Sequence, residues 1–429
     1  MGLAIEPRLV TELAGGLGRG SIVVSGTNGK TTTASIVAAA ARKAGLTAVA
    51  NASGSNLMRG IASALAQRAG VMGEMPDGTD TIGVFEVDEA ALPQALRDLQ
   101  PRVAVITNLF RDQLDRYGEV EAVADLWRGA LAGAPSTLTL VLNADDPTVA
   151  SLGEGRERVL YFGLDDPALD RGCLEHASDA LTCGCGARYA YDRVYFGHIG
   201  VWRCPACGRA RPRPAVRAEA VDLRDGRSLR FRLQTPRRDA EVELQVGGAY
   251  NVYNALAAVA AAEALALPEA AAAAALSAAT AAFGRQEAFE IDGRRVELFL
   301  GKNPAGLNQV LATLRLDPLR RSALVILNDG IADGRDISWV WDADFEVAAG
   351  QFEAVVVAGT RAHEMALRLK YAEWDERRLA VEPDIGRALD AALQRTQAGA
   401  CLSIIPTYTA MLEVRELLAR RAGRAPFWQ

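Results

Sequence analysis

The sequence predicts an α/β protein built on parallel strands, and three observations lead to that class. Short apolar runs of strand length recur along the 429 residues, helical patterns lie between them, and a glycine-rich loop joins the first such run to the first helix. Half of the residues are apolar and 23% are charged, which is a globular composition with enough material for a sizeable core. At roughly 100–200 residues per domain, the length predicts two or three domains.

The first part of the chain alternates strands and helices. A buried strand is predicted at 21–25, followed by the glycine-rich loop and a helix over 31–44 that Gly45 ends. Later segments continue this order, with strands expected at 81–87, 102–107 and 138–143, and helices at 93–99 and 119–131.

The stretch 170–217 interrupts this pattern. It is rich in Cys, Gly, Arg and Pro and too long for an ordinary loop, so we expect an inserted module. Alternating apolar residues over 218–246 predict strands, and 251–282 predicts an alanine-rich helical region. We assign residues 1–289, including the insertion, to one central domain.

A second α/β unit begins near Ile291, and we assign residues 290–429 to a Rossmann-like C-terminal domain. Its strands and helices again alternate. The expected strands are 323–327, 352–357, 379–381 and 401–405, and the expected helices are 362–370, 385–395 and 409–421.

Charge and hydropathy exclude several classes. The net charge of −6 gives no basic field that would favour a nucleic-acid partner. No uncharged apolar run is long enough to cross a bilayer, so we expect no transmembrane segment. The first ten residues lack the apolar centre of a signal peptide, and we therefore expect a cytoplasmic protein.

The glycine-rich loop has the residues of a phosphate-binding site. Between a strand and a helix, glycines let backbone N–H groups approach an anion, the lysine reaches the β- and γ-phosphates, and a threonine hydroxyl ligates Mg²⁺. Val24 stands where the eight-residue P-loop begins with Gly, so the loop is a shorter variant. Its lysine is one of four in a chain with 43 arginines. The loop consists of Gly26, Thr27, Asn28, Gly29, Lys30, Thr31 and Thr32.

Four of the six cysteines are clustered, which favours a metal site over disulfides. Cys204-Pro-Ala-Cys207 forms a metal-binding knuckle, and Cys183-Gly-Cys185 supplies a second pair, one residue shorter than usual. Together they predict a closed Cys₄ zinc ribbon, for which His198 is an alternative ligand but is expected instead to fill a hydrogen-bonding role within the module. A degenerate ribbon that folds without metal is the alternative.

The loop resembles the ATP-binding signature of the Mur ligase and folylpolyglutamate synthase superfamily, and further matches follow in the same order over 26–287. They are Glu86-Val-Asp88-Glu89, Thr107-Asn108-Leu-Phe-Arg-Asp112, Asn143-Ala-Asp145-Asp146-Pro147, Asn251-Val-Tyr-Asn254 and Gly284-Arg285-Gln286-Glu287. This resemblance implies a central P-loop ATPase domain. It implies Glu86 as a Mg²⁺ ligand beside Thr31, and Asn108, Asn251, Asn254 and Arg285 as nucleotide-binding residues.

The chain departs from the amino-acid-adding Mur ligases at two points. Gln113 replaces a metal-binding His, and no lysine occurs between Lys43 and Lys302 that could be the carbamylated metal ligand of those enzymes. The short segment before the first strand also leaves no room for their sugar-nucleotide domain.

The insertion and three C-terminal segments, 301–309, 328–342 and 406–415, resemble the MurT-type subunits of lipid II isoglutaminyl synthases. That resemblance implies ATP-dependent amidation of the D-glutamate α-carboxylate of lipid II to D-isoglutamine, through an acyl phosphate, in peptidoglycan synthesis. Lys30 and Glu86 would serve the phosphoryl transfer.

The ammonia is expected to come from a partner. Neither cysteine outside the ribbon, Cys173 or Cys401, lies in a Gly-x-Cys-x-Gly elbow, so this chain is not expected to be a glutaminase. The resemblance implies a heterodimer with a GatD-type glutaminase subunit whose catalytic triad is completed by an Asp of this chain, for which we select Asp342, ahead of Asp336 and Asp344. Two alternatives are a folylpolyglutamate-type amino-acid ligase and an ATP-dependent scaffold without catalysis.

Overall fold

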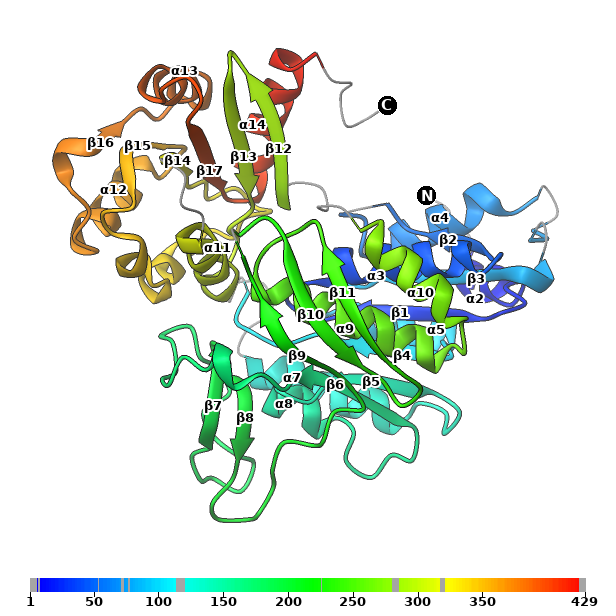
Figure 1. Ribbon diagram of the computed structural model, residues 1–429. Coiled ribbons are helices and arrows are strands. Elements are labelled where there is room, and N and C mark those ends of the chain that lie inside the picture. The colour runs from blue at the N-terminus through cyan, green and yellow to red at the C-terminus, as the bar shows by residue number, and fades with distance from the viewer. Residues whose placement is uncertain are drawn as a thin grey trace.

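The computed structural model describes residues 6, 8–52, 54–70, 73–75, 78–112, 120–224, 226–279, 285–316 and 321–423, apart from the Arg285 side chain. It confirms the α/β class, but both larger sheets are mixed rather than fully parallel. Figure 1 shows two lobes, each centred on one of these sheets, with a small hairpin below the larger lobe.

The larger lobe contains a nine-stranded sheet in the order β11-β10-β9-β6-β5-β4-β1-β3-β2. From β2 to β9 every neighbouring pair is parallel, whereas β9, β10 and β11 pair antiparallel and account for the alternating pattern over 218–246. The strands are β1 Ser21–Ser25, β2 Thr47–Ala50, β3 Thr81–Glu86, β4 Val103–Ile106, β5 Thr139–Asn143, β6 Val159–Leu164, β9 Val216–Asp222, β10 Leu229–Gln234 and β11 Asp239–Leu244.

Helices cover both faces of this sheet. β1 is buried along its whole length, because Ile22 and Val24 face one apolar core and Val23 faces the other. The first core lies under α3 Lys30–Lys43, α9 Ala249–Ala264 and α10 Glu269–Ser277. The second lies under α2 Leu9–Ala14, α4 Met58–Arg68, α5 Leu92–Leu99, α7 Val120–Ala132 and α8 Pro147–Ser151.

The described part of the alanine-rich region forms two helices, α9 and α10. α9 ends at Ala264, Ala266 takes a left-handed φ of 55°, and Pro268 precedes the first residue of α10. Because proline lacks a backbone N–H and disfavours helix in the residue before it, the chain turns there. The two helices then pack against α3.

The cysteine-rich segment leaves the large sheet and returns to it. It separates β6 from β9, which are neighbours in that sheet, and it forms its own hairpin from β7 Ala190–Phe196 and β8 Ile199–Arg203. The turn of this hairpin points toward the body of the larger lobe in Figure 1. We call the segment 170–217 the cysteine module.

The smaller lobe contains a six-stranded sheet in the order β12-β13-β17-β14-β15-β16, in which only β12 and β13 are antiparallel. The sequence reasoning missed this hairpin, and β12 begins before the boundary we expected at 289/290. The strands are β12 Arg285–Ile291, β13 Arg294–Phe299, β14 Arg321–Ile326, β15 Phe352–Ala358, β16 Leu379–Val381 and β17 Cys401–Pro406. The helices are α11 Pro304–Leu316, α12 Ala362–Tyr371, α13 Ile385–Arg395 and α14 Tyr408–Arg421.

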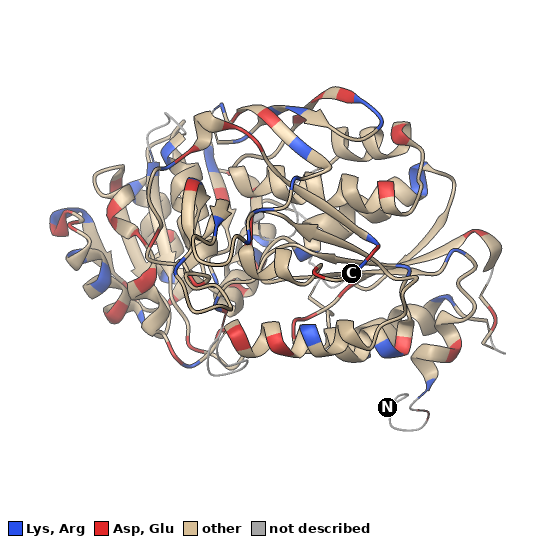
Figure 2. Cartoon of the chain, turned by 90° about the horizontal axis from the view of Figure 1, so that it is seen from below, with Lys and Arg blue, Asp and Glu red and all other residues tan. Residues whose placement is uncertain are grey.

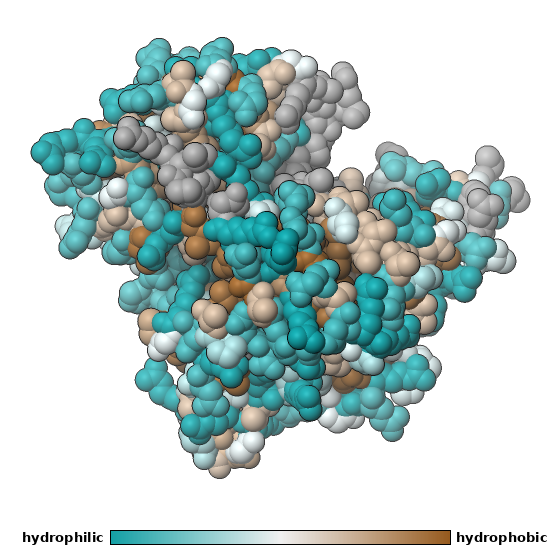
Figure 3. Space-filling model, viewed as in Figure 1, coloured by the Kyte–Doolittle hydropathy of each residue, from teal (hydrophilic) through white to brown (hydrophobic). Residues whose placement is uncertain are grey.

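Charged residues of both signs are interspersed along the ribbon rather than gathered by sign (Figure 2). Among the helices that the structure describes, none combines the length and apolar character needed to cross a bilayer. In Figure 3 apolar residues gather at the centre of the visible face, where α11 of the smaller lobe meets the large sheet.

Candidate functional site

The glycine-rich loop connects β1 to α3, and two of its positions require glycine. Gly26 and Gly29 have φ values of 128° and 88°, which side chains rarely adopt. A Cβ on Gly26 would lie 2.2 Å from Thr107 Oγ1, and one on Gly29 would lie 2.1 Å from Asn254 Oδ1. The loop therefore needs glycine for both its conformation and its close neighbours.

Lys30 opens α3 with its ammonium buried beneath the loop. Its Nζ donates to Gly26 O at 2.5 Å and to Thr27 O at 3.2 Å, and it pairs with Glu89 Oε1 at 3.0 Å. Burial lowers the pKa of Lys30, but the carboxylates of Glu89, Glu86 and Asp112 outweigh it and the net pKa is raised. The ammonium is thus held charged at the loop.

The acidic residues after β3 surround this lysine. Glu86, Asp88 and Glu89 are all buried. Glu86, the expected Mg²⁺ ligand, contributes to the field at Lys30, but Glu89 makes the direct ion pair. Burial raises the pKa of Glu89 although Lys30 and Lys302 oppose the shift. The sequence analysis quoted Glu89 within its motif without assigning it a role.

Lys302 brings a second lysine to this cluster from the smaller lobe. Its Nζ pairs with Asp112 Oδ2, and its charge acts on Glu89. Two of the four lysines in the chain therefore meet at one acidic cluster, although they are far apart in sequence. Gln113, expected in place of a metal-binding His, lies outside the described residues.

Asparagines fix the loop from both lobes. The backbone N–H of Asn28 donates to Asn108 Oδ1 at 2.9 Å, and Asn108 Nδ2 donates to Asn28 O at 3.0 Å. Thr107 Oγ1 also donates to Asn28 O at 2.7 Å. From the smaller lobe, Asn303 Nδ2 donates to Asn28 Oδ1 at 3.2 Å. Thr27 Oγ1 accepts from the N–H of Phe110 at 2.9 Å and donates to its carbonyl at 3.0 Å.

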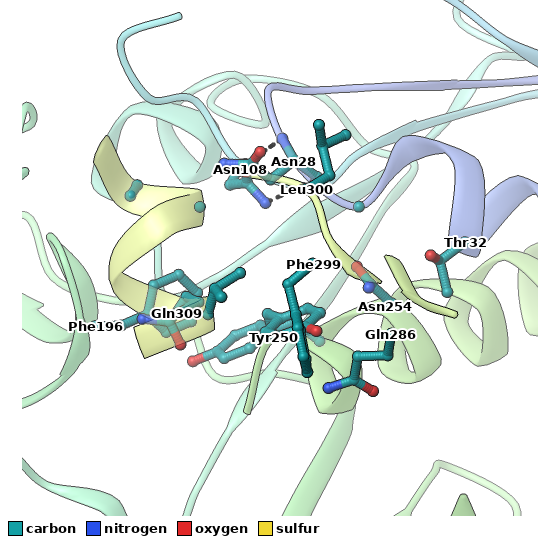
Figure 4. A pocket seen from close by; sticks show the side chains of 15 residues that line it. Asn28, Thr32, Asn108, Phe196, Tyr250, Asn254, Gln286, Phe299, Leu300 and Gln309 are labelled. Atoms are coloured by element: carbon teal, nitrogen blue, oxygen red, sulfur yellow. Dashed lines mark hydrogen bonds between the residues drawn. The ribbon is translucent and has the colours of Figure 1, made fainter. Parts of the chain in front are cut away.

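A cavity of about 700 Å³ adjoins the loop between the two lobes (Figure 4). Thr32 lies on one side of this view, Gln309 and Phe196 lie on the other, and Tyr250 lies between them. Thr31 is partly exposed in the first turn of α3. The lining residues are Asn28, Gly29, Thr32, Asn108, Phe196, Tyr250, Tyr253, Asn254, Gln286, Phe299, Leu300, Ala305, Gly306, Gln309 and Val310.

Two of the expected nucleotide residues lie at the start of α9. Asn254 lines the cavity, and its Nδ2 donates to Asn251 Oδ1 at 3.0 Å. Asn251 in turn donates to Gly247 O at 2.7 Å, so it supports Asn254 from behind. The side chain of Arg285 lies outside the described residues.

The cysteine module supplies one wall of the cavity through Phe196. This ring lies 6.1 Å from the ring of Phe110 and packs edge-on against Tyr253 at 5.4 Å. His198 of the same turn is fully buried, contacts the Phe110 ring in a tilted arrangement with centroids 4.4 Å apart, and accepts a hydrogen bond from the Asp179 N–H at 3.2 Å. The hydrogen-bonding role expected for His198 agrees with this position, which lies outside the cysteine cluster.

The four clustered cysteines lie at the other end of the β7–β8 hairpin. Cys183 Sγ is 3.6 Å from Cys207 Sγ, Cys185 Sγ is 3.5 Å from Cys204 Sγ, and all four sulfurs lie within 4.8 Å of one another. A tetrahedral zinc with bonds of about 2.3 Å requires sulfurs separated by about 3.8 Å. The positions and the thiol chemistry of these four residues therefore fit a zinc ion.

Three aspartates of the segment 333–344, Asp336, Asp342 and Asp344, lie in different surroundings. Asp342 is partly exposed and lies 3.3 Å from Arg111. Asp344 is mostly buried, accepts from Asn308 Nδ2 at 2.7 Å and lies 2.6 Å from His176 Nδ1. Asp336 caps the turn that leads to Ser338.

An apolar patch lies on the same lobe as this segment. We call it the aromatic patch, and its members share high exposure for large apolar side chains. Its members are Trp341 and Tyr371, exposed to 50% and 67%, while Ile331, Val347 and Leu367 are further exposed apolar side chains of this lobe, at 83%, 40% and 48%. The rings of Trp341 and Tyr371 are 5.8 Å apart, and the Arg368 guanidinium lies over Trp341.

Models of known protein families match segments in both lobes of the chain. Residues 24–183 match the Mur ligase middle domain, and residues 300–411 match the MurT ligase C-terminal domain. The chain is 35% identical over 412 residues to the lipid II isoglutaminyl synthase (glutamine-hydrolyzing) subunit MurT of Streptococcus pneumoniae (strain ATCC BAA-255 / R6). It is 32% identical over 400 residues to the subunit of the same name from Staphylococcus aureus (strain COL). Each alignment covers 93% of this chain and 87% of the relative.

Solved structures show the same fold at lower sequence identity. A pseudomurein peptide ligase type C from Methanothermus fervidus superimposes with a TM-score of 0.70 at 24% identity, covering 94% of this chain and 78% of that one. MurF from Acinetobacter baumannii superimposes with a TM-score of 0.70 at 17% identity, covering 97% and 79%.

Proposed function

The chain belongs to the MurT family of Mur ligases, and from this membership we propose that it is the ATP-dependent subunit of a lipid II isoglutaminyl synthase. It would convert the D-glutamate α-carboxylate of lipid II to the amide of D-isoglutamine. The observation that carries this proposal is the buried Lys30 ammonium, held at a glycine-rich loop among carboxylates of the larger lobe, one of which pairs with Lys302 of the smaller lobe.

The chemistry requires activation because a carboxylate does not react with ammonia near neutral pH. An oxygen of the carboxylate attacks the γ-phosphorus of ATP, and the bond from that phosphorus to the β,γ-bridging oxygen breaks. ADP departs, and the substrate carboxylate has become an acyl phosphate. Ammonia then attacks the acyl carbon, inorganic phosphate departs, and a proton is lost to give the amide. The first step depends on positioning and charge neutralisation, which Lys30 and the loop N–H groups would supply.

Mg²⁺ is the metal that this proposal requires at the loop. Thr31 and Glu86 would hold it, because a threonine hydroxyl and a carboxylate are oxygen ligands of the kind that Mg²⁺ prefers. When bound, the ion neutralises charge on the β- and γ-phosphates. The nucleotide would extend from the loop into the cavity, which Asn108 and Asn254 line. Asn251 would act indirectly, through its hydrogen bond with Asn254. We also assign Arg285 to this site.

The cysteine module is proposed to be a zinc ribbon that holds one structural ion through Cys183, Cys185, Cys204 and Cys207. The spacing of the four sulfurs supports this assignment. We propose a central domain over 1–289, this insertion over 170–217 and a Rossmann-like C-terminal domain over 290–429, with β12 Arg285–Ile291 crossing the boundary between the first and the last. A cytoplasmic location, with membrane contact only through lipid II, is part of the same proposal.

The ammonia would come from a glutaminase partner of the GatD type that docks on the smaller lobe. The aromatic patch is the apolar surface that such docking would bury. Asp342 lies beside the patch and pairs with Arg111, but its side chain is 40% exposed, whereas the Asp344 side chain is 16% exposed and is bound to both Asn308 and His176. We therefore retain Asp342 as the residue that completes the partner's triad, a positioning role.

The test uses the purified chain with lipid II, Mg²⁺ and ATP. Ammonium should give amidated lipid II and one ADP per product, and glutamine should replace ammonium only when the glutaminase is added. Asp342→Ala should abolish the use of glutamine and leave the use of ammonium intact. Asp336→Ala is the matched control and should affect neither.

Three other outcomes would contradict either the proposed reaction or the choice of Asp342. A product that carries an added amino acid would identify a ligase of the folylpolyglutamate type. ATP binding without ADP formation in the presence of lipid II and ammonium would identify a scaffold. Continued glutamine use by Asp342→Ala would place the triad acid elsewhere in the segment.

A further inference from the structure

The turn between β13 and α11 places a lysine of the smaller lobe beside the phosphate-binding loop. Lys302 lies in this turn, and the side chain of the next residue, Asn303, exchanges two hydrogen bonds with the side chain of Asn28, at 3.2 and 3.4 Å. A Cβ on Gly306, in the first turn of α11, would lie 3.6 Å from Asn28 Oδ1. Because the start of α11 contacts the loop, Lys302 lies next to the expected position of the phosphates.

Lys302 has N–H donors that the protein does not use. A lysine ammonium has three donors, and Lys30 directs all three to the protein, two to loop carbonyls and one to Glu89. Lys302 donates to Asp112, and no other acceptor among the described residues bonds to its Nζ. Its side chain is 23% exposed, compared with 7% for Lys30. Lys302 can therefore bind an anion without losing its present partner.

Lys302 lies outside the cavity that would hold the rest of the nucleotide. Among the residues that the structure describes, the wall of that cavity includes Asn28 of the loop and Asn254 at the start of α9, but neither Lys302 nor Asp112. The charge of Lys302 acts instead on Glu89, in the acidic cluster after β3. A nucleotide whose base end extends toward Asn254 would therefore bring its γ-phosphate, at the other end, closest to Lys302.

The proposed phosphoryl transfer needs a cation for the substrate carboxylate. The γ-phosphate and the carboxylate are both anions and repel each other, and in-line attack requires the carboxylate to approach the γ-phosphorus opposite the departing ADP. The loop and Lys30 belong to the larger lobe and would bind the nucleotide itself. Lys302 reaches the same end of the phosphate chain from the smaller lobe, with donors to spare.

We propose that Lys302 binds the α-carboxylate of the substrate through its unused donors and places one carboxylate oxygen against the γ-phosphorus. Asp112 holds the ammonium in position. Because the amide product is uncharged, its contact with the ammonium is weaker than that of the carboxylate, and this difference favours release of the product. The inference rests on the proposed function and deepens it by naming the residue that recognises the group to be amidated.

The test compares the affinity of the full chain for lipid II and for amidated lipid II, with Mg²⁺ and a non-hydrolysable ATP analogue present. The wild-type chain should bind the carboxylate form about tenfold more tightly, because hydrogen bonds between charged groups are the stronger ones. Lys302→Gln keeps a donor for Asp112 but has no charge, so it should bind both forms equally and bind the ATP analogue as the wild type does. Lys302→Met should behave in the same way and serves if the glutamine variant is poorly folded.

Asp112→Asn is the matched control, because it removes the ion pair and leaves the ammonium. It should keep the preference for the carboxylate form. No preference in the wild-type chain, or an unchanged preference in both Lys302 variants, would overturn the inference and leave the proposed function standing. Weaker binding of the ATP analogue with an unchanged preference would also overturn it, because the ammonium would then serve the γ-phosphate. A wild-type chain that forms no amidated lipid II from lipid II, ATP and ammonium would instead overturn the proposed function.

Discussion

At the level of single residues, the arginine-rich composition makes each lysine informative. Lys30 packs under a tight loop, donates to two carbonyls and pairs with Glu89. An ammonium is compact and has three donors, whereas a guanidinium is broad and planar, so arginine would not fit this site in the same way. Lys302 reaches the same acidic cluster from the other lobe.

Replacing Lys30 should separate its catalytic role from its structural one. Lys30→Met should abolish ADP formation and lower the free energy of unfolding by about 3 kcal/mol, because it leaves Glu89 buried without its partner. The double variant Lys30→Met, Glu89→Gln should regain much of this stability and remain inactive. Urea unfolding and an ADP assay measure the two effects, and residual turnover in the stable double variant would show that Lys30 is not part of the phosphoryl-transfer site.

At the level of elements, the cysteine module is more than an appendage to the sheet. Its hairpin carries four cysteines at one end and Phe196 at the other, where the ring forms part of the cavity wall. The module is also anchored by a buried ion pair, in which Arg211 Nε donates to Asp145 Oδ1 at 2.6 Å. Burial raises the pKa of Asp145 although Arg211 opposes the shift. Loss of order at the cysteine end should therefore reach the nucleotide cavity.

Removing the proposed zinc tests this connection. Cys204→Ser should lower bound zinc and the melting temperature, and weaken ATP binding severalfold through displacement of Phe196. Cys173→Ser, which alters an exposed cysteine outside the cluster, is the matched control and should leave all three unchanged. Zinc content, thermal unfolding and calorimetry are the measurements. Full nucleotide affinity in a zinc-free Cys204→Ser chain would show that the module and the cavity are independent.

At the level of the whole molecule, several polar contacts join the two lobes around the cavity. Lys302 pairs with Asp112, and Asn303 bonds to Asn28 at the loop itself. The cysteine module adds a further bridge, because His176 pairs with Asp344 of the smaller lobe. These contacts bring groups of both lobes together around the proposed nucleotide site.

The pair between His176 and Asp344 makes one bridge sensitive to pH. The hydrogen bond and charge of Asp344 raise the pKa of His176, so its contribution to stability is fully present below pH 6.5 and is lost as the pH rises through the folded-state pKa. NMR titration of the three histidines should show His176 titrating above its ordinary value. Asp344→Asn should return it toward that value, and an unchanged titration in this variant would show that the bridge does not form in solution.

Features that depend on neighbouring residues in the chain could be predicted from the sequence alone. The glycine-rich loop, the buried strand before it and the clustered cysteines are encoded in short segments, because backbone conformation and ligand type depend on adjacent residues. The order of the motifs also identified the Mur ligase superfamily before any contact was known. Reasoning of this kind missed β2, β6, α2, α4, α8, α11 and the β12–β13 hairpin, most of whose apolar patterns are short or ambiguous.

Contacts between residues that are far apart in the sequence depend on the tertiary structure. The ion pair between Lys30 and Glu89, the arrival of Lys302 at Asp112, and the approach of Phe196 and Gln309 to one cavity all depend on how the sheets, the cysteine module and α11 pack together. No local pattern encodes such contacts, because side-chain burial and charge interactions are set by neighbours in space and not by neighbours in the chain.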